Sequence, residues 1–373
     1  MYTNGLFVAG LARDYGLTRV QFGFGVLLVT MALAFANPVV GWLVDRLGAK
    51  WLSVAGLVLL SAGFASLGAF IDSIPSYFAL QVLVALAGAA SGPIAYSKII
   101  NETFIRHRGL ALGITMTGIG LTAAAIPPVL AGIIEEHGWR SGYYYLAAVP
   151  LAGAVLTALL LPSRHAVGVQ KNSLQAQAAP GEAFQRSRVF WMLAGTFALM
   201  SLSFMGLVPH FVPMLGDAGL DPRAAGSLAG QIGLAVIASR MLVGLALDRI
   251  FAPRIAIFIC LVAAAGNLAF LLMGVGSASL TAIAMGLALG AELDLMGFLI
   301  ARYFGLAQFG KVYGWLYFAF IFASGLGPLW VGAVRDGTGD YSLALVASVA
   351  GLLLSCGGFL MMPRYPDQAP SRA

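Results

Sequence analysis

The chain has 373 residues, of which 60% are hydrophobic and only 10% are charged, and its mean hydropathy is +0.90. Soluble domains carry about 25% charged residues, so this composition excludes a soluble globular protein. It predicts an all-α integral membrane protein, whose 47 glycines suit helices that pack closely within a membrane. The net charge is +6, but the basic residues do not form a cluster, so nucleic acid is not expected as a partner.

Eleven apolar runs are each long enough to cross a bilayer, which takes roughly 20 residues. In chain order they cover 20–43, 50–71, 76–101, 109–134, 141–162, 189–215, 223–247, 255–276, 279–301, 311–334 and 341–362. A polar stretch separates the fifth run from the sixth and is typical of a flexible linker. The predicted organisation is a first bundle at 1–162, a linker at 163–188, a second bundle at 189–362 and a tail at 363–373.

Basic residues are distributed unequally between the two sides of the predicted membrane. The loops of one side carry 14 of the 21 Lys and Arg residues and those of the other side carry 5. The positive-inside rule places the richer side in the cytosol. We therefore expect a multi-pass protein of a bacterial inner membrane, with the linker and the C-terminal tail in the cytosol.

The two halves repeat one pattern. The segment GWLVDR at 41–46 recurs as GLALDR at 244–249, and Gly109 and Gly113 recur as Gly310 and Gly314. Repeats in the same orientation require an even number of spans per half and indicate a pseudo-two-fold axis along the membrane normal. In the second half, Asp248 lies about 60 residues after the start of that half near Arg188, whereas only 44 residues precede Asp45 in the first half. Most of a first helix is therefore expected to be missing.

Several motifs carry a family resemblance. The stretch GWLVDRLGAK at 41–50 is similar to the signature between the second and third helices of the major facilitator superfamily. Four further segments resemble its monocarboxylate transporter and oxalate/formate antiporter branch: YGLTR at 15–19, RGLALG at 108–113, GWR at 138–140 and RYFG at 302–305. The resemblance implies two six-helix bundles around a central cavity and alternating access to a small organic anion, commonly coupled to protons. Some monocarboxylate transporters carry an aspartate four residues before an arginine of the eighth helix. In this chain the arginine corresponds to Arg240, and the residue four positions before it is Val236.

Charged side chains within apolar spans are costly and are therefore functional candidates. Arg240 is predicted to bind the substrate, because a guanidinium group stays charged and can contact both oxygens of a carboxylate; a structural ion pair is the alternative. Glu292 and Asp294 are spaced i, i+2 on one helix and point in different directions. One of them is expected to accept a proton or to balance Arg240, and a fixed structural pair is again the alternative.

Four other residues are predicted to contact the substrate: Lys98, Tyr96, Asn4 and His210. For Lys98 the alternative is a surface pair with Glu102, four residues further along the same helix. For His210 the alternatives are a titrating gate and a hydrogen-bonded residue that lines the cavity.

The repeated motifs predict a gate made of Gly41, Asp45 and Arg46 in the first half and Gly244, Asp248 and Arg249 in the second. Each aspartate is expected to meet the positive N-terminal end of a helix in the other half. When the incomplete first helix is counted, these are the eleventh helix (run 311–334) and the fifth helix (run 109–134). The contacts are expected in one state of a transport cycle. Anchoring of the arginines at the cytosolic face is the alternative.

Other chemistry has no support in the sequence. Cys260 and Cys356 lie far apart in apolar runs, and neither a metal-ligand spacing, nor a nucleotide-binding loop, nor a catalytic cluster occurs. We therefore expect no cofactor, no metal and no enzymatic activity. The sequence predicts a secondary transporter of a small carboxylate, driven by protons or by anion exchange. Proton-coupled efflux of a drug-like compound and a non-transporting receptor or inactive paralogue are the alternatives, and the oligomeric state is undetermined.

Overall fold

The apolar runs form helices throughout the part of the chain that the computed structural model describes, residues 4–104, 107–161, 184–220 and 222–366. Ten helical stretches in this part are long and apolar enough to cross a membrane, and one of them, Ala252–Phe304, contains two helices. Each of the eleven predicted runs therefore corresponds to a helical segment.

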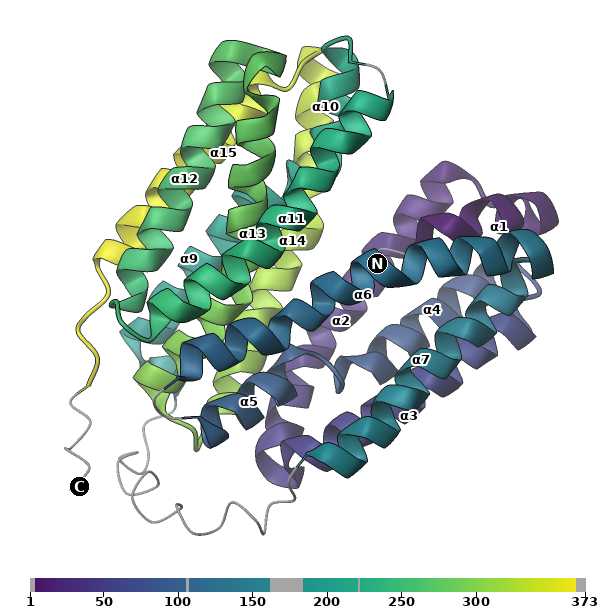
Figure 1. The fold of residues 1–373 in the computed structure, drawn as a ribbon, viewed down its shortest axis with the longest axis horizontal. Coiled ribbons are helices and arrows are strands. Elements are labelled where there is room, and N and C mark those ends of the chain that lie inside the picture. The colour runs from purple at the N-terminus through teal and green to yellow at the C-terminus, as the bar shows by residue number, and fades with distance from the viewer. Residues whose placement is uncertain (1–3, 105–106, 162–183, 221, 367–373) are drawn as a thin grey trace.

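The first half of the chain begins with a short helix and continues with long ones (Figure 1). Its elements are η1 (Asn4–Phe7), α1 (Val8–Tyr15), α2 (Arg19–Leu47), α3 (Ala49–Phe70), α4 (Ile74–Ala89), α5 (Pro93–Thr103), α6 (Arg108–His137) and α7 (Trp139–Leu160). The run 76–101, which was expected to form one helix, is split into α4 and α5 because Pro93 starts a new helix at its first position, where the missing N–H of proline costs nothing.

The second half consists of η3 (Phe184–Arg186), α9 (Arg188–Met205), η4 (Val208–His210), α10 (Phe211–Asp217), α11 (Pro222–Leu247), α12 (Ala252–Met273), η5 (Gly274–Ser277), α13 (Ala278–Phe304), α14 (Phe309–Thr338) and α15 (Ser342–Leu360). The run 189–215 is likewise interrupted, since Pro209 lies in the short turn η4 between α9 and α10. Proline lacks the N–H that a continuous helix would need there.

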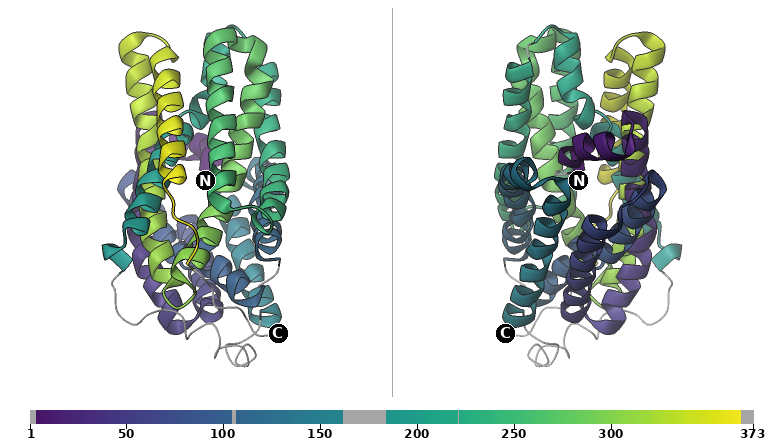
Figure 2. Two further views of the ribbon diagram at one scale, coloured as in Figure 1. Left: turned by 90° about the vertical axis from the view of Figure 1, so that its left-hand side faces the viewer. Right: turned by 90° about the vertical axis from the view of Figure 1, so that its right-hand side faces the viewer.

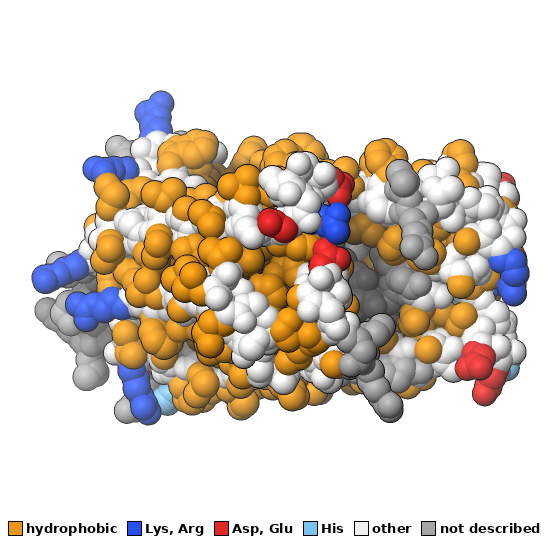
Figure 3. Space-filling view, turned by 90° about the horizontal axis from the view of Figure 1, so that it is seen from above, with side chains coloured by type: hydrophobic (Ala, Val, Ile, Leu, Met, Phe, Trp, Pro, Cys, Tyr) orange, Lys and Arg blue, Asp and Glu red, His pale blue; other side chains and the backbone are white. Residues whose placement is uncertain are grey.

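The two halves form two groups of helices that converge at one end and diverge toward the other (Figures 1 and 2). We call the converging end, where α7 ends and α9 begins, the linker end, and the opposite one the far end. Seen from above, hydrophobic side chains cover much of the visible surface, basic ones gather at the left-hand edge, and a small group of acidic side chains with a basic one lies near the middle (Figure 3). Large apolar side chains such as Leu159 and Leu272 are about three-quarters exposed, as expected for helices whose outer faces meet lipid.

The halves meet through two matching helix pairs, α2 with α14 and α6 with α11. A Cβ atom on Gly41 would collide with the carbonyl oxygen of Gly310, and a Cβ atom on Gly113 would collide with that of Arg240. Only glycine allows the backbones to approach this closely. The repeated glycines predicted from the sequence thus lie at the contacts between the two bundles.

The N-terminal segment packs across the far end of the first bundle. Phe7 stacks on Tyr143 with ring centroids 3.9 Å apart. The Trp139 indole N–H donates to Asp14 at 2.8 Å, and Arg140 donates to the Tyr15 hydroxyl at 2.7 Å. The α1 helix has eight residues, too few to span a bilayer, and it docks on the first turn of α7.

Candidate substrate site and gate

Arg240 lies in the interior of the protein, on α11. Its side chain is 5% exposed, and Nη1 lies 3.6 Å from Oδ1 of Asp294, which is on α13 and fully buried. The two helices pack closely because Gly290 brings α13 against Val236 and Ser239 of α11. The guanidinium group is therefore covered by protein and faces an acid on the neighbouring helix.

The charged groups of this cluster have few hydrogen bonds. Arg240 Nε and Nη1, Glu292 Oε2 and both carboxylate oxygens of Asp294 are buried and make no hydrogen bond to another described residue. A strong charge-assisted bond between nitrogen and oxygen is about 2.7–2.9 Å long, so the contact between Arg240 and Asp294 is loose. Buried polar groups are nearly always satisfied, and a cluster of exceptions is typical of a site that a bound solute completes.

Two hydroxyl groups that were not predicted from the sequence, those of Ser97 and Tyr313, lie close to this cluster. A Cβ atom on Gly297, one turn after Asp294, would lie 3.4 Å from Ser97 Oγ and 3.6 Å from Tyr313 Cε2. Both hydroxyl oxygens are buried, and apart from one another they have no hydrogen-bond partner among the described residues. Because Ser97 is on α5, the first bundle also reaches this region. The only sequence signal for it was the position of Ser97 directly between the selected residues Tyr96 and Lys98.

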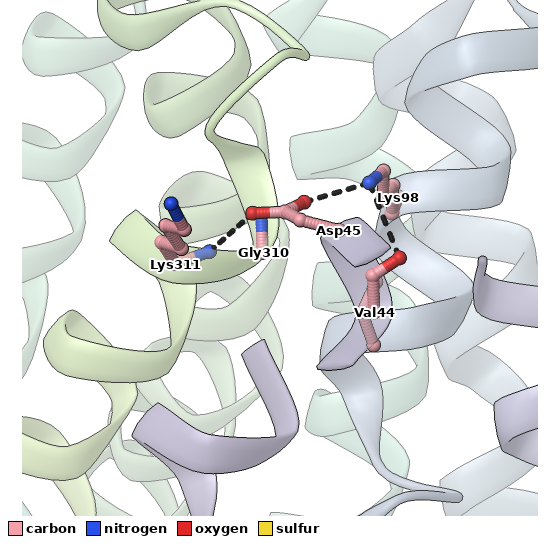
Figure 4. A network of polar contacts seen from close by, with 5 residues as sticks. All are labelled: Val44, Asp45, Lys98, Gly310 and Lys311. Carbon is pink, nitrogen blue, oxygen red and sulfur yellow. Dashed lines mark hydrogen bonds and ion pairs between the residues drawn. The ribbon is translucent and has the colours of Figure 1, made fainter. Parts of the chain in front are cut away.

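The carboxylate of Asp45 caps the N-terminus of α14 (Figure 4). It accepts the backbone N–H groups of Gly310 at 3.0 Å and of Lys311 at 2.8 Å. The Lys98 ammonium group donates to Asp45 Oδ1 at 2.6 Å and to the Val44 carbonyl at 3.4 Å. The predicted contact of this aspartate with the eleventh-helix N-terminus is confirmed.

The second motif repeats this geometry on the opposite pair of helices. Asp248 accepts the backbone N–H of Gly109 at 2.7 Å and that of Leu110 at 3.0 Å, at the N-terminus of α6. Gly244 packs against the backbone of Gly109 and Leu110. This confirms the predicted contact with the fifth-helix N-terminus. Each capped helix belongs to the bundle opposite its aspartate, so both contacts join the bundles at the linker end.

The arginines of the two motifs take no part in the aspartate contacts described above. Arg46 lies over the ring of Trp42 at 4.2 Å, and Arg249 is exposed. The aspartates and the glycines therefore make the contact between the bundles, while the arginines lie beside it.

Lys98 is engaged differently from the predicted surface pair. Its partner is Asp45 on α2, and both side chains are only 7% exposed. The expectation of a surface pair with Glu102 is wrong, because the Lys98 side chain reaches across to a neighbouring helix instead of remaining on its own. Tyr96, on the same helix, is partly buried, and its contact with substrate stays a prediction.

His210 lies toward the far end, whereas the contacts of Asp45 and Asp248 lie at the linker end. His210 Nε2 is 3.0 Å from the Pro328 carbonyl oxygen, and Nδ1 is 3.4 Å from the Tyr341 hydroxyl. This fits the alternative of a hydrogen-bonded lining residue. Asn4 begins η1, and its side chain lies outside the described part of the chain. The structure thus brings Arg240, Glu292 and Asp294 together and places His210 elsewhere, while the contact of Asn4 with substrate stays a prediction.

Helices of this length, number and pairing define a polytopic membrane transporter with two bundles. The model of the Major Facilitator Superfamily matches residues 1–328, and the chain belongs to this family. It is 25% identical over 382 residues to monocarboxylate transporter 13 of Rattus norvegicus, covering 96% of this chain and 86% of that protein. It is 26% identical over 356 residues to the 2-nitroimidazole transporter of Escherichia coli, covering 92% and 86%.

The fold likewise matches a solved transporter. The structure of the proton:xylose symporter XylE superposes with a TM-score of 0.77 at 14% identity, covering 96% of this chain and 91% of that one. The protein is therefore an integral, multi-pass membrane transporter of small organic substrates, not an enzyme.

Proposed function

We propose that this transporter moves a small organic anion that bears a carboxylate, by alternating access between its two bundles. The observation that carries the proposal is the buried Arg240 guanidinium group, which is loosely paired with Asp294 and has two nitrogens that make no hydrogen bond to another described residue. A substrate carboxylate would supply the missing acceptors in a bidentate arrangement. The similarity to monocarboxylate transporter 13 supports this choice of cargo.

Asp294 and Glu292 are the counter-ions in this mechanism. When the substrate binds Arg240, the Asp294 carboxylate loses its partner in a region of low dielectric, where an unpaired charge is costly. Uptake of a proton by Asp294 or Glu292 removes that cost and couples substrate movement to proton movement. Exchange transport is the other outcome, in which a second anion takes the place of the first and no proton is needed.

The capped helices form the gate of the cycle. Asp45 and Asp248 hold the bundles together at the linker end, which the excess of Lys and Arg assigns to the cytosol. In this state the pathway opens to the opposite side. The bundles 1–162 and 189–362 would then rock about the site between them, with the linker 163–188 and the tail 363–373 in the cytosol.

The test is uptake of labelled mono- and dicarboxylates into proteoliposomes, with and without a proton gradient. Arg240→Gln should reduce kcat/KM at least about tenfold, since a charge-assisted hydrogen bond contributes ~1.5–3 kcal/mol. Arg254→Gln, an exposed arginine at the start of α12, is the matched control. Unchanged uptake in a folded Arg240→Gln protein would refute the proposal.

Export of a drug-like compound is the second candidate, favoured by the likeness to the 2-nitroimidazole transporter. In that case the buried acid Glu292, whose Oε2 lacks a hydrogen bond to the described residues, would face the cargo. Transport of a nitroimidazole that depends on Glu292 but not on Arg240 would favour this function over carboxylate transport.

A further inference from the structure

A pocket of about 340 Å³ lies at the linker end, beside the second gate contact. The first turn of α6, the junction of α11 with α12, the end of α13 and the C-terminal segment line it. Its walls contain three arginines, Arg108, Arg249 and Arg302, and one acid, Asp248. The lining is therefore positive overall, and the proposed transport mechanism uses none of its three arginines.

Arg108 is the buried member of this group, with 8% of its surface exposed. Its Nε and Nη2 atoms donate to the carbonyl oxygens of Phe104 and Asn101, both at 3.2 Å. No acidic side chain among the described residues forms an ion pair with it. Its positive charge is thus placed in the pocket wall with only neutral acceptors.

The other charges of the pocket do not neutralise Arg108. Asp248 is close enough to interact with it electrostatically, but both Asp248 oxygens already accept backbone N–H groups of α6. Arg302 interacts with Arg108 as well, and that interaction is repulsive. Two guanidinium groups held near each other in a partly closed space favour an anion between them.

Aromatic residues hold the remaining wall in place. The Arg302 guanidinium carbon lies 4.5 Å from the ring centroid of Tyr365, whose hydroxyl accepts the N–H of Ala252 at 3.0 Å. Tyr303 donates to the Pro363 carbonyl at 2.6 Å. These contacts fix the C-terminal segment against the second bundle and give the pocket an apolar side next to its charged one.

We propose that this pocket binds a phosphate group, which Arg108 of the first bundle and Arg249 and Arg302 of the second contact together. A doubly charged oxyanion matches the excess of two positive charges and the planar donor geometry of guanidinium groups. Because these arginines belong to different bundles, the bound anion stabilises the closed linker end. The volume leaves room for an organic part of a phosphate ester beside Tyr365 and Phe251.

The experiment measures thermal unfolding of the full chain in nanodiscs of phosphatidylcholine, with potassium phosphate against potassium chloride at equal ionic strength. A ligand that binds the folded state raises the melting temperature in a saturable manner. The second arm uses nanodiscs that contain phosphatidic acid, without free phosphate. Arg108→Gln and the exposed Arg249→Gln are compared with Arg254→Gln, an arginine at the same end that does not line the pocket.

A saturable shift with phosphate in neutral lipid identifies a free anion as the source, and a shift only with phosphatidic acid identifies a lipid headgroup. In either case the half-saturating concentration or lipid fraction should rise about tenfold in Arg108→Gln and Arg249→Gln and stay constant in Arg254→Gln. Arg249→Gln keeps the test valid where Arg108→Gln, which loses two hydrogen bonds, does not fold. The proposal is overturned when neither arm gives a shift, or when all three variants respond as the wild type does. Neither outcome depends on the transported cargo.

Discussion

Replacing Asp248 or Asp45 by asparagine tests the gate directly. Each aspartate accepts two backbone N–H groups from a helix of the opposite bundle. Asparagine has one acceptor oxygen, so each variant loses about one charge-assisted bond, worth ~1.5–3 kcal/mol. This loss shifts the ratio of closed to open linker ends about 10- to 150-fold in each variant, at 1.4 kcal/mol per tenfold change.

The two variants should differ in overall stability. Lys98 and Asp45 both belong to the first bundle and are 7% exposed, so their ion pair persists when the bundles separate. Asp45→Asn leaves the Lys98 charge buried without its partner, which costs ~3–5 kcal/mol in both states. It therefore lowers the melting temperature clearly more than Asp248→Asn, which loses only the bond across the bundles. The double variant Asp45→Asn with Lys98→Met should recover much of the lost stability.

Distances between the bundles give the measurement. Spin labels at Leu47 and Arg254, two exposed residues near the linker end of the first and second bundle, report opening as a longer distance component. The buried cysteines Cys260 and Cys356 are first replaced by alanine. Asp217→Asn, which removes the exposed ion pair of Asp217 with Arg335 within the second bundle, is the control and should leave the distance unchanged. The reasoning is refuted when neither gate variant lengthens the distance, or when Asp248→Asn destabilises the protein as strongly as Asp45→Asn.

Three further results are expected. Gly113→Ala forces α6 away from the Arg240 carbonyl at a cost of ~1–3 kcal/mol, so it should open the linker end in the same distance assay. The control is Gly118→Ala, whose added methyl group has no neighbour within 4 Å and should leave the distance unchanged. Arg240→Lys keeps the charge but cannot bind two oxygens at once, so it should raise KM for carboxylates, and an unchanged KM contradicts bidentate binding. The Trp139 indole holds the pKa of Asp14 below its usual value. The ionised Asp14 carboxylate therefore contributes its full stabilisation above about pH 4, the ordinary pKa of an aspartate, and this stabilisation is lost as the pH falls through the lowered pKa. When melting temperatures are measured against pH, Asp14→Asn should lack this acid-dependent step.

The long-range pattern of this fold could be predicted from the sequence because it depends on length and on repetition. Apolar runs of sufficient length can only be helices in a membrane. The repeated Gly-Asp motifs identified both contacts between the bundles, since backbone approach and helix capping each require a particular residue type. The breaks at Pro93 and Pro209 also had a visible cause, but a single proline within a long apolar run does not show whether a membrane helix bends or ends.

The partners of individual side chains could not be predicted in the same way. Lys98 has an acid four residues away in Glu102, but its bond is to Asp45, 53 positions distant. Asp14 meets Trp139 across 125 positions. Such contacts depend on how helices pack rather than on spacing within one helix. The Tyr313 hydroxyl was missed for a related reason, because a tyrosine in an apolar run differs little from the phenylalanines around it.

The position of the charges within the pseudo-symmetric fold constrains the mechanism. The gate occurs twice, once on each pair of helices, but Arg240, Glu292 and Asp294 all lie in the second bundle. In the proposed cycle, rocking of the bundles would break and form the helix caps without separating Arg240 from Asp294, so the motion alone would not expose a bare charge to a low dielectric. Only a solute or a proton can change that pair. The first bundle brings the neutral Ser97 hydroxyl on α5 to the same region. A change in the charge of the Arg240–Asp294 pair therefore alters the surface of α13 against which α5 packs. In the proposed cycle, this links occupancy of the site to the motion of the gate.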